Sequence, residues 1–251
     1  MKSSMETMIS SIVSILGGSA HSIWLYGSVV HDDFRFGWSD IDFNAYANAP
    51  LTDAQAERLL TLRQSLSAQN PESPYFRCFE GVITTLGNDS RTVYWGTSGQ
   101  RIVARYEPDT FAEYELWKYS VSVYGSDDKS IFRCPSWKEM IEAIRRHYNA
   151  IRTCAVQTDR RLYSCGWLLD IARCIYTLRN HDVIAKTKAG EWALSEHLFP
   201  HEEALRKTLT VRRDPLRYKD LPETQAWLEN LGPIVQDCAD VLEKELNAIR
   251  A

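Results

Sequence analysis

Two short segments place residues able to do chemistry close together near the start of the chain. Gly27 and Ser28 follow one apolar run, and Asp40 and Asp42 lie in a second, with eleven residues between Ser28 and Asp40. Residues two apart on a strand project to the same face, so the two carboxylates are expected side by side. Like charges at that distance repel unless a cation lies between them. Mg²⁺ fits, because it prefers oxygen ligands and commonly joins one or two carboxylates to substrate phosphates.

A third carboxylate and a turn extend this pattern. Glu80 lies in the apolar run RCFEGVIT (residues 77–84), where a buried acid is costly without a partner. If that strand neighbours the one carrying Asp42, the acids converge. Gly27 lets backbone N–H groups approach a ligand and Ser28 adds a hydroxyl, so the turn could hold a phosphate. Each feature alone also fits a plain turn or a solvated strand face, but together they favour metal-assisted phosphoryl transfer.

The elements that must position these residues change in character along the chain. Hydrophobic periodicity, capping signals and turn residues predict the following segments. Strands are expected over residues 22–27, 40–47 and 75–86 and in a hairpin around GTSGQ (96–100). Helices are expected up to Gly17-Gly18, over 51–69, from a capping box of Thr110 and Glu113, and over 137–156, 160–180, 187–198, 201–209 and 223–249.

This order predicts an α+β protein of two domains. A mixed-sheet domain is expected over residues 1–128 and an all-helical bundle over 129–251, with a boundary in the linker-like stretch 125–136. Residues 1–128 carry 9 Lys and Arg against 16 Asp and Glu, a net charge of −7, whereas residues 129–251 carry 20 against 17, a net of +3. That asymmetry suits a cleft for cations and a polyanion, although chance variation of the surface explains it equally well.

Composition excludes several classes of protein. Hydrophobic residues make up 44% of the chain and charged residues 25%, as in globular proteins. A net charge of −4 argues against a basic surface for nucleic acid, and the apolar runs are too short to span a membrane. The six cysteines show no zinc-ligand spacing, which favours reduced thiols in a cytoplasmic protein.

At this point the sequence resembles a known family. Tyr26-Gly27-Ser28 followed by Ser39-Asp40-Ile41-Asp42 is similar to the signature of the nucleotidyltransferase superfamily that includes DNA polymerase β. Three further segments resemble the aminoglycoside adenylyltransferases that modify streptomycin and spectinomycin. These are RCFEGVIT (77–84), FAEY (111–114) and IARCIYTLRNHDVIAKTKAGEW (171–192), so the resemblance covers most of the chain.

The resemblance implies a reaction and a role for each matching residue. An AMP group would pass from ATP to a hydroxyl of the antibiotic, and pyrophosphate would leave. Asp40 and Asp42 would hold two Mg²⁺ ions, and Glu80 would be the general base. The remaining matches imply phosphate contacts from Gly27, Ser28, Ser39, Arg173 and Lys186, and antibiotic contacts from Tyr114 and Asp159.

Departures from the family concern the acceptor more than the chemistry. The loop VVHDDFRFGWS (residues 29–39) is aromatic, acidic and slightly longer, and Tyr114 replaces a tryptophan. In that loop Asp32 and Asp33 are expected to be solvated, while Trp38 could stack on a ligand. A lincosamide, another small alcohol or a protein side chain stays open as acceptor, and so does a non-catalytic nucleotide-binding regulator. We expect a monomer that binds ATP and a cationic small molecule and that binds neither nucleic acid nor a membrane.

Overall fold

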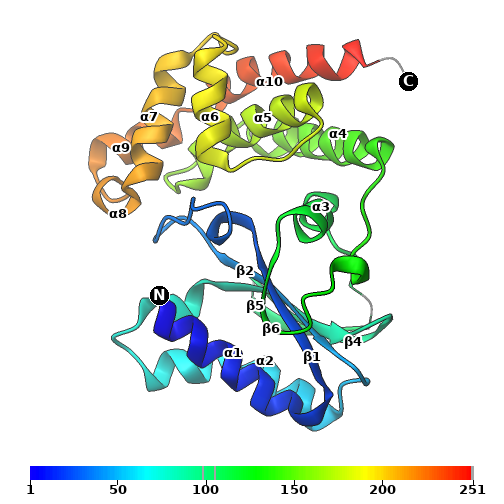
Figure 1. Ribbon diagram of the computed structural model, residues 1–251. Coiled ribbons are helices and arrows are strands. Elements are labelled where there is room, and N and C mark those ends of the chain that lie inside the picture. The colour runs from blue at the N-terminus through cyan, green and yellow to red at the C-terminus, as the bar shows by residue number, and fades with distance from the viewer. Residues whose placement is uncertain (98, 105, 250–251) are drawn as a thin grey trace. The chain divides into compact units, whose positions relative to one another are not determined.

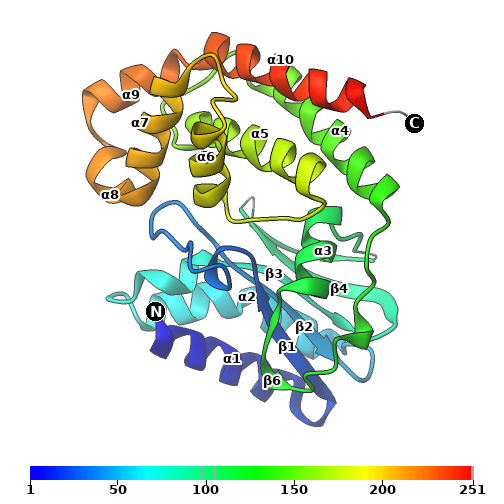
Figure 2. The ribbon, with the colours of Figure 1, turned by 45° about the horizontal axis from the view of Figure 1, so that its top comes forward.

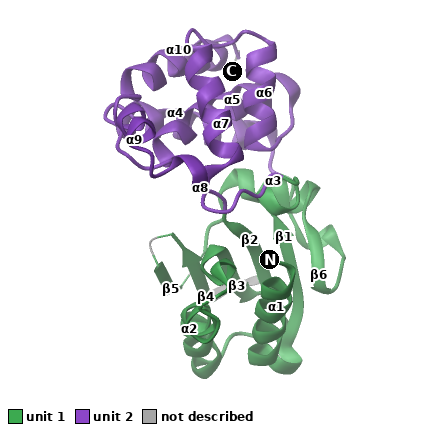
Figure 3. Ribbon diagram, turned by 90° about the vertical axis from the view of Figure 1, so that its left-hand side faces the viewer, with its two compact units in different colours: residues 1–32, 40–134 green, residues 33–39, 135–251 purple. Residues whose placement is uncertain are grey.

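The computed structural model describes residues 1–97, 99–104 and 106–249, and these form two compact units (Figure 3). The sheet unit comprises residues 1–32 and 40–134, and the helical unit comprises residues 33–39 and 135–251. The sequence-based division at residue 128 assigned each domain one continuous stretch. In the structure, the short segment 33–39 leaves the sheet unit and belongs to the helical unit.

A six-stranded mixed sheet forms the centre of the sheet unit. The sequence predicted a mixed sheet there and five of its six strands. Its strands are β1 (Ala20–Tyr26), β2 (Ile41–Ala47), β3 (Phe79–Thr85), β4 (Asn88–Gly96), β5 (Gly99–Val103) and β6 (Val121–Gly125). Their spatial order is β5-β4-β3-β2-β1-β6. Strands β2 and β3 run parallel, and the other neighbouring pairs run antiparallel. This order places the two acid-bearing strands next to each other in the middle of the sheet.

The two faces of the sheet differ because side chains alternate along each strand. One face presents Phe43, Phe79 and Trp95, which are almost fully buried and meet in edge-to-face contacts. The indole N–H of Trp95 donates to the carbonyl of Leu59, 3.1 Å away in α2. Helices α1 (Lys2–Leu16) and α2 (Asp53–Gln69) lie side by side on this face (Figures 1 and 2). Asp42 and Glu80 therefore project from the opposite face.

Local capping explains where several helices begin. A capping box of Thr52 and Gln55 starts α2, and one of Ser136 and Glu139 starts α4. The predicted start of α3 (Thr110–Lys118) was wrong by one residue. Its N-cap is Asp109, whose carboxylate accepts from the two backbone N–H groups at Phe111 and Ala112.

Seven helices make up most of the described part of the helical unit. They are α4 (Trp137–Cys154), α5 (Tyr163–Asn180), α6 (Lys186–Ser195), α7 (Glu202–Arg213), α8 (Pro215–Tyr218), α9 (Pro222–Glu229) and α10 (Gly232–Ala248). Helix α5 is central, since 13 of its 18 residues are buried and helices α4, α6, α7, α9 and α10 pack on it (Figure 2). None of the described helices has the length and hydropathy that crossing a membrane requires.

One local expectation from the sequence was wrong, and two short elements were missed. Residues 74–78 form a 3₁₀ turn, so β3 begins at Phe79 and not at residue 75. The edge strand β6 and the short helix α8 were not predicted. Strand β6 is only five residues long, exposed at both ends and half-exposed between them. So short a segment gives only a weak strand signal in the sequence.

Candidate active site

The register of the parallel pair brings two of the predicted acids together. Asp42 of β2 is the direct partner of Glu80 of β3, and partners in a parallel ladder project to the same face. Asp40 immediately precedes β2 and is exposed. The guanidinium of Arg63 lies within electrostatic reach of Asp40 and Glu80. Its burial lowers its pKa, and the two carboxylates oppose that shift. We call Asp40, Asp42 and Glu80 the acid group.

The glycine turn is built around the Asp42 carboxylate. Gly27 has φ 68°, and a Cβ atom at this position would lie 2.3 Å from Oδ2 of Asp42. Only glycine fits, both for the backbone conformation and for the space. The hydroxyl of Ser28 donates to the backbone carbonyl of Asp40 over 3.1 Å. Gly27 and Ser28 therefore lie directly beside Asp42 and Asp40.

Two neutral donors hold the Glu80 side chain. The hydroxyl of Tyr94 lies 3.4 Å from Oε1, and that of Thr97 lies 3.2 Å from Oε2. Burial raises the pKa of Tyr94, and the Glu80 charge raises it further, so the phenol stays protonated. The Tyr94 ring stacks on Tyr106, and the guanidinium of Arg101 lies 4.3 Å from its centroid. Glu80 thus has a fixed direction, as a general base requires.

The acid group supplies the kind of ligands that magnesium prefers. Within the described residues, no three or more His, Cys, Asp or Glu side chains are already grouped to hold a metal ion. Mg²⁺ commonly needs only one or two carboxylates, because it takes water and substrate phosphates as further ligands. The Gly27 backbone approaches the Asp42 carboxylate closely, so the turn and these oxygens lie side by side. The residues present therefore fit such an ion.

The helical unit gathers cations around one buried acid. Asp170 of α5 is 5% exposed, and its carboxylate lies 2.8 Å from Nζ of Lys186, 3.8 Å from His147 and 4.0 Å from Arg173. Burial alone would raise the pKa of Asp170, but these cations outweigh it and the pKa falls below its ordinary value. We call Asp170, Lys186, Arg173 and His147 the cation cluster. It contains both cations that the sequence assigned to phosphate binding.

Sequence reasoning missed Asp170, although a signal was present. The acid stands in the apolar run GWLLDIARC (residues 166–174), three residues before Arg173. An acid in such a run needs a partner inside the fold, and Lys186 provides it. The same logic found Glu80 on its strand.

Two further predicted residues make local contacts. Asp159 accepts from the backbone N–H of Arg161 over 2.9 Å and pairs with its guanidinium, next to the start of α5. Its side chain is 48% exposed. Ser39 accepts from the backbone N–H of Arg35 over 3.0 Å. Both side chains therefore shape turns, and the roles assigned to them remain predictions.

The predicted acceptor residue Tyr114 lies in α3 of the sheet unit and is buried. Its ring packs against Trp117 and Tyr119, and the ammonium of Lys118 lies 3.3 Å from its hydroxyl. An antibiotic contact at this residue is still a prediction.

One expectation about the loop was wrong. Asp33 was expected to be solvated, but it is 4% exposed and pairs with Arg212, which is 2% exposed. Its charge is stabilised inside the helical unit by this partner. Asp32 is exposed, as predicted.

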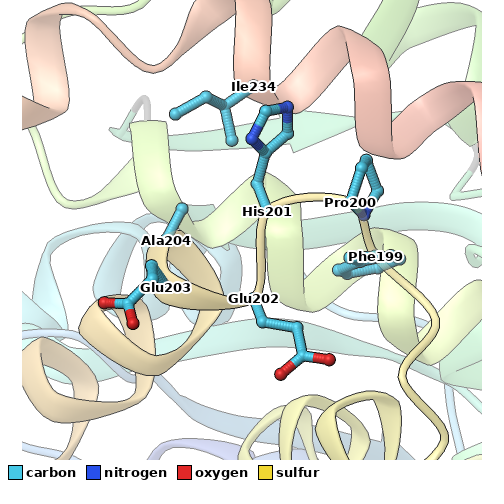
Figure 4. A pocket seen from close by; sticks show the side chains of 7 residues that line it. All are labelled: Phe199, Pro200, His201, Glu202, Glu203, Ala204 and Ile234. Atoms are coloured by element: carbon cyan, nitrogen blue, oxygen red, sulfur yellow. The ribbon is translucent and has the colours of Figure 1, made fainter.

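A surface pocket of about 450 Å³ lies elsewhere on the helical unit, at the start of α7 (Figure 4). Its lining residues are Phe199, Pro200, His201, Glu202, Glu203, Ala204 and Ile234. His201 is paired with Asp237 over 2.7 Å, and the pocket includes no member of the acid group or the cation cluster. It has no part in the argument for activity.

Comparison with known proteins agrees with this arrangement. Residues 131–237 match the family described as aminoglycoside adenylyltransferase, C-terminal domain. The fold resembles a spectinomycin adenyltransferase, AAD(9), from Enterococcus faecialis, solved with ATP and spectinomycin. That structure has a TM-score of 0.70 and 18% identity over 97% of this chain and 99% of the other. No curated protein is matched by the sequence.

Toxin–antitoxin structures align only weakly. One complex with AMP-PNP has a TM-score of 0.30 and 15% identity over 58% of this chain and 91% of that one. The tri-AMPylated HEPN toxin with MNT antitoxin from Shewanella oneidensis has a TM-score of 0.29 and 16% identity, over 60% and 95%.

The fold of the chain is that of the solved adenyltransferase, with a mixed sheet that carries the acid group beside a glycine turn and a helical unit. Residues 131–237, most of the helical unit, are similar to the C-terminal domain of aminoglycoside adenylyltransferases.

Proposed function

We propose that the protein transfers AMP from ATP to a hydroxyl of an aminoglycoside or aminocyclitol antibiotic, with Mg²⁺, and releases pyrophosphate. One observation carries this proposal: Asp42 and Glu80 are register partners beside the Gly27 turn, in a chain whose helical half matches the adenylyltransferase family. The solved relative in fold has ATP and spectinomycin bound. That supports an aminocyclitol as the acceptor.

The chain offers both neutral hydrogen-bond donors and cationic side chains for the triphosphate. The backbone at Gly27 and the hydroxyls of Ser28 and Ser39 are donors for phosphate oxygens. Lys186 and Arg173 are cations with partly exposed side chains, at 30% and 22%, and they are proposed to bind the phosphates. Fixed cations near a leaving pyrophosphate stabilise the charge that develops on it.

Asp40 and Asp42 are proposed to hold the magnesium. The ion would polarise the phosphoryl oxygens and neutralise their charge. The Asp42 carboxylate lies against the Gly27 backbone, which restricts the positions it can take.

Glu80 is proposed to remove the proton from the acceptor hydroxyl. The hydroxyl oxygen then bonds to the α-phosphorus, and the bond from that phosphorus to the bridging oxygen of pyrophosphate breaks. Tyr94 and Thr97 hold the base in place during the transfer. Tyr114 and Asp159 are proposed to contact the antibiotic. A monomer acting in the cytoplasm, where ATP and Mg²⁺ are available, suits these substrates.

The decisive experiment mixes purified protein, Mg-ATP and one antibiotic at a time. Spectinomycin and streptomycin are tested first, then other aminoglycosides, a lincosamide and simple alcohols. Mass spectrometry should find an adduct of one AMP on the antibiotic, with one pyrophosphate released per adduct, and EDTA should stop both. The Asp42→Asn variant should fold normally and transfer nothing.

The outcomes separate the candidate functions. Transfer to a lincosamide or another alcohol alone would keep the chemistry and correct the acceptor. Unchanged activity of Asp42→Asn would contradict the role given to that acid. Absence of any adduct, with ATP still bound, would favour a nucleotide-binding regulator.

A further inference from the structure

The loop between the two halves of the signature is built into the helical unit. The chain leaves the sheet unit after Asp32 and returns to it at Asp40, and residues 33–39 belong to the helical unit (Figure 3). We call residues 33–39 the anchored loop. Its two flanks are residues on which the proposed reaction depends: the Gly27-Ser28 turn precedes it, and Asp40 follows it directly.

Asp33 fastens the start of the anchored loop to the first turn of α6. Its carboxylate accepts from the backbone N–H of Thr187 over 3.2 Å and from the hydroxyl of Thr187 over 2.5 Å. Arg212 of α7 donates to the same carboxylate over 2.7 Å and to the Thr187 hydroxyl over 2.9 Å. All three side chains are buried. A charge removed from water in this way is stable only with such partners.

Through the hydrogen bond from the Thr187 backbone N–H, the Asp33 side chain caps the N-terminus of α6. The residue before that helix is Ala185, which has no side chain able to cap it. Backbone N–H groups in a first helical turn need an outside acceptor. Asp33, 154 residues earlier in the chain, provides that acceptor.

The helix capped by Asp33 begins with Lys186. That lysine precedes Thr187 directly and is held at its ammonium by Asp170, 2.8 Å away. The first turn of α6 is therefore fixed twice, once at the Lys186 ammonium by Asp170 and once at the Thr187 backbone by Asp33. Moving Asp33 would shift the backbone from which the Lys186 side chain extends.

Two more contacts fix the rest of the anchored loop. Gly37 has φ 88°, and a Cβ atom there would lie 2.8 Å from Leu216 of α8. The guanidinium of Arg212 lies 5.3 Å from the centroid of the Trp38 ring, within the range of a cation–π contact. Trp38, which the sequence left open as a ligand-stacking residue, thus lies on a residue of the helical unit. The anchored loop therefore contacts the helices of its unit both at its start, through Asp33, and near its end, through Gly37 and Trp38.

We propose that Asp33 is a positioning residue for nucleotide binding: it fixes the chain between the phosphate turn and Asp40 to the first turn of the helix that carries Lys186. The inference rests on the proposed function, since it assumes that Lys186 binds the nucleotide phosphates. Asp33 touches no substrate in this scheme. It acts through Lys186 on one side and through the backbone leading to Asp40 on the other.

The test compares Asp33→Asn with Asp32→Asn. Both variants remove one negative charge from adjacent positions, but Asp32 is exposed and lies outside the anchored loop. The dissociation constant of Mg-ATP is measured by calorimetry, with the KM of ATP and of the acceptor from steady-state kinetics. Circular dichroism and thermal melting report the folded fraction. We expect Asp33→Asn to weaken Mg-ATP binding at least about tenfold, while the KM of the acceptor and all values for Asp32→Asn stay within about twofold.

A structural role alone would give a different result. If Asp33→Asn melts earlier but binds Mg-ATP like the wild type per folded molecule, the proposal is overturned. If Asp33→Asn does not fold, Thr187→Val decides, because it removes the hydroxyl that bonds Asp33 and Arg212 and keeps the ion pair between those two residues. Unchanged Mg-ATP binding in that variant overturns the proposal, and weaker binding with an unchanged acceptor KM supports it.

The binding measurement also separates this proposal from the proposed function. It needs no acceptor, so it decides the role of Asp33 even if the wild type transfers AMP to no antibiotic tested. A wild type that binds no Mg-ATP would overturn the proposed function, and this proposal with it. A wild type that binds and an Asp33→Asn variant that binds equally well would overturn this proposal alone.

Discussion

The ammonium of Lys186 lies 2.8 Å from the carboxylate of Asp170, and the two residues come from neighbouring helices, α6 and α5. Asp170 is nearly fully buried, whereas the Lys186 side chain is 30% exposed. The acid is therefore held inside the fold while part of the lysine remains open to solvent. Arg173 and His147 also lie within 4.0 Å of this carboxylate.

The first prediction concerns Asp170 itself. Asp170→Asn should lower the free energy of unfolding by about 3 kcal/mol, because breaking a buried pair leaves charge without its partner. It should also weaken Mg-ATP binding about tenfold, since the Lys186 ammonium loses its fixed position. Urea titration measures the first effect and calorimetry the second.

A matched control comes from the same unit. Asp240→Asn removes a carboxylate that pairs with Arg152, but Asp240 is 57% exposed. Exposed pairs contribute about 0–1 kcal/mol, so this variant should stay near the wild type in both measurements. Equal losses in the two variants would contradict the role given to burial at Asp170.

The second prediction concerns the turn beside Asp42. Gly27→Ala should cost about 1–2 kcal/mol of stability through its positive φ. It should also reduce kcat about 100-fold, because the new methyl group displaces the Asp42 carboxylate and small misplacements are costly in catalysis. Gly17→Ala is the control: Gly17 has φ 59° but nothing within 4 Å of the position of a Cβ. It should lose similar stability and keep its activity.

The third prediction separates Glu80 from the residues that hold it. Glu80→Gln should lower kcat about 10²–10⁴-fold, as expected when a general base is lost, and leave Mg-ATP binding nearly unchanged. Tyr94→Phe removes only a 3.4 Å hydrogen bond to the base and should lower kcat about tenfold or less. Single-turnover measurements at saturating ATP test both. A Glu80→Gln variant of wild-type speed would refute its assignment as the base.

The sequence predicted the positions of the acids in the sheet unit better than those in the helical unit, for a physical reason. Strand periodicity predicted Asp40 and Asp42 on one face, although β2 begins only at Ile41, and an acid in an apolar strand, such as Glu80, needs a partner. These are local signals, readable within a few residues. What they could not supply was the register that makes Asp42 and Glu80 neighbours, since that depends on how two distant strands pair.

The helical unit depends on contacts that are distant in sequence. Asp33 meets Thr187 and Arg212 from 154 and 179 residues away. Nothing near Asp33 distinguishes it from Asp32, which is exposed. Loop composition therefore predicted solvation for both acids, and only tertiary structure separates them. The segment match to the adenylyltransferase family identified Arg173 and Lys186 but not the acid that holds them.

The last prediction concerns acid stability. The pKa of Asp33 is below its ordinary value of 3.8, because the Arg212 charge and hydrogen bonds from Thr187 and Arg212 outweigh the effect of burial. The pKa of Asp170 is lowered in the same direction. A carboxyl whose pKa is lower in the folded state binds fewer protons there than in the unfolded state. Its contribution to stability is therefore complete well above pH 3.8 and is lost as the pH falls through its folded pKa.

Urea titrations at pH 7, 5, 4 and 3 should show this loss directly. The contributions of Asp33 and Asp170 to the free energy of unfolding should stay nearly constant from pH 7 to 5. They should fall steeply below about pH 4. Asp170→Asn removes one of the two groups, so its curve should be lower at pH 7 and less steep below pH 4. Asp240→Asn, at the exposed pair with Arg152, should follow the wild-type slope closely. A slope for Asp170→Asn as steep as that of the wild type would show that Asp170 does not ionise at a lowered pKa in the folded protein.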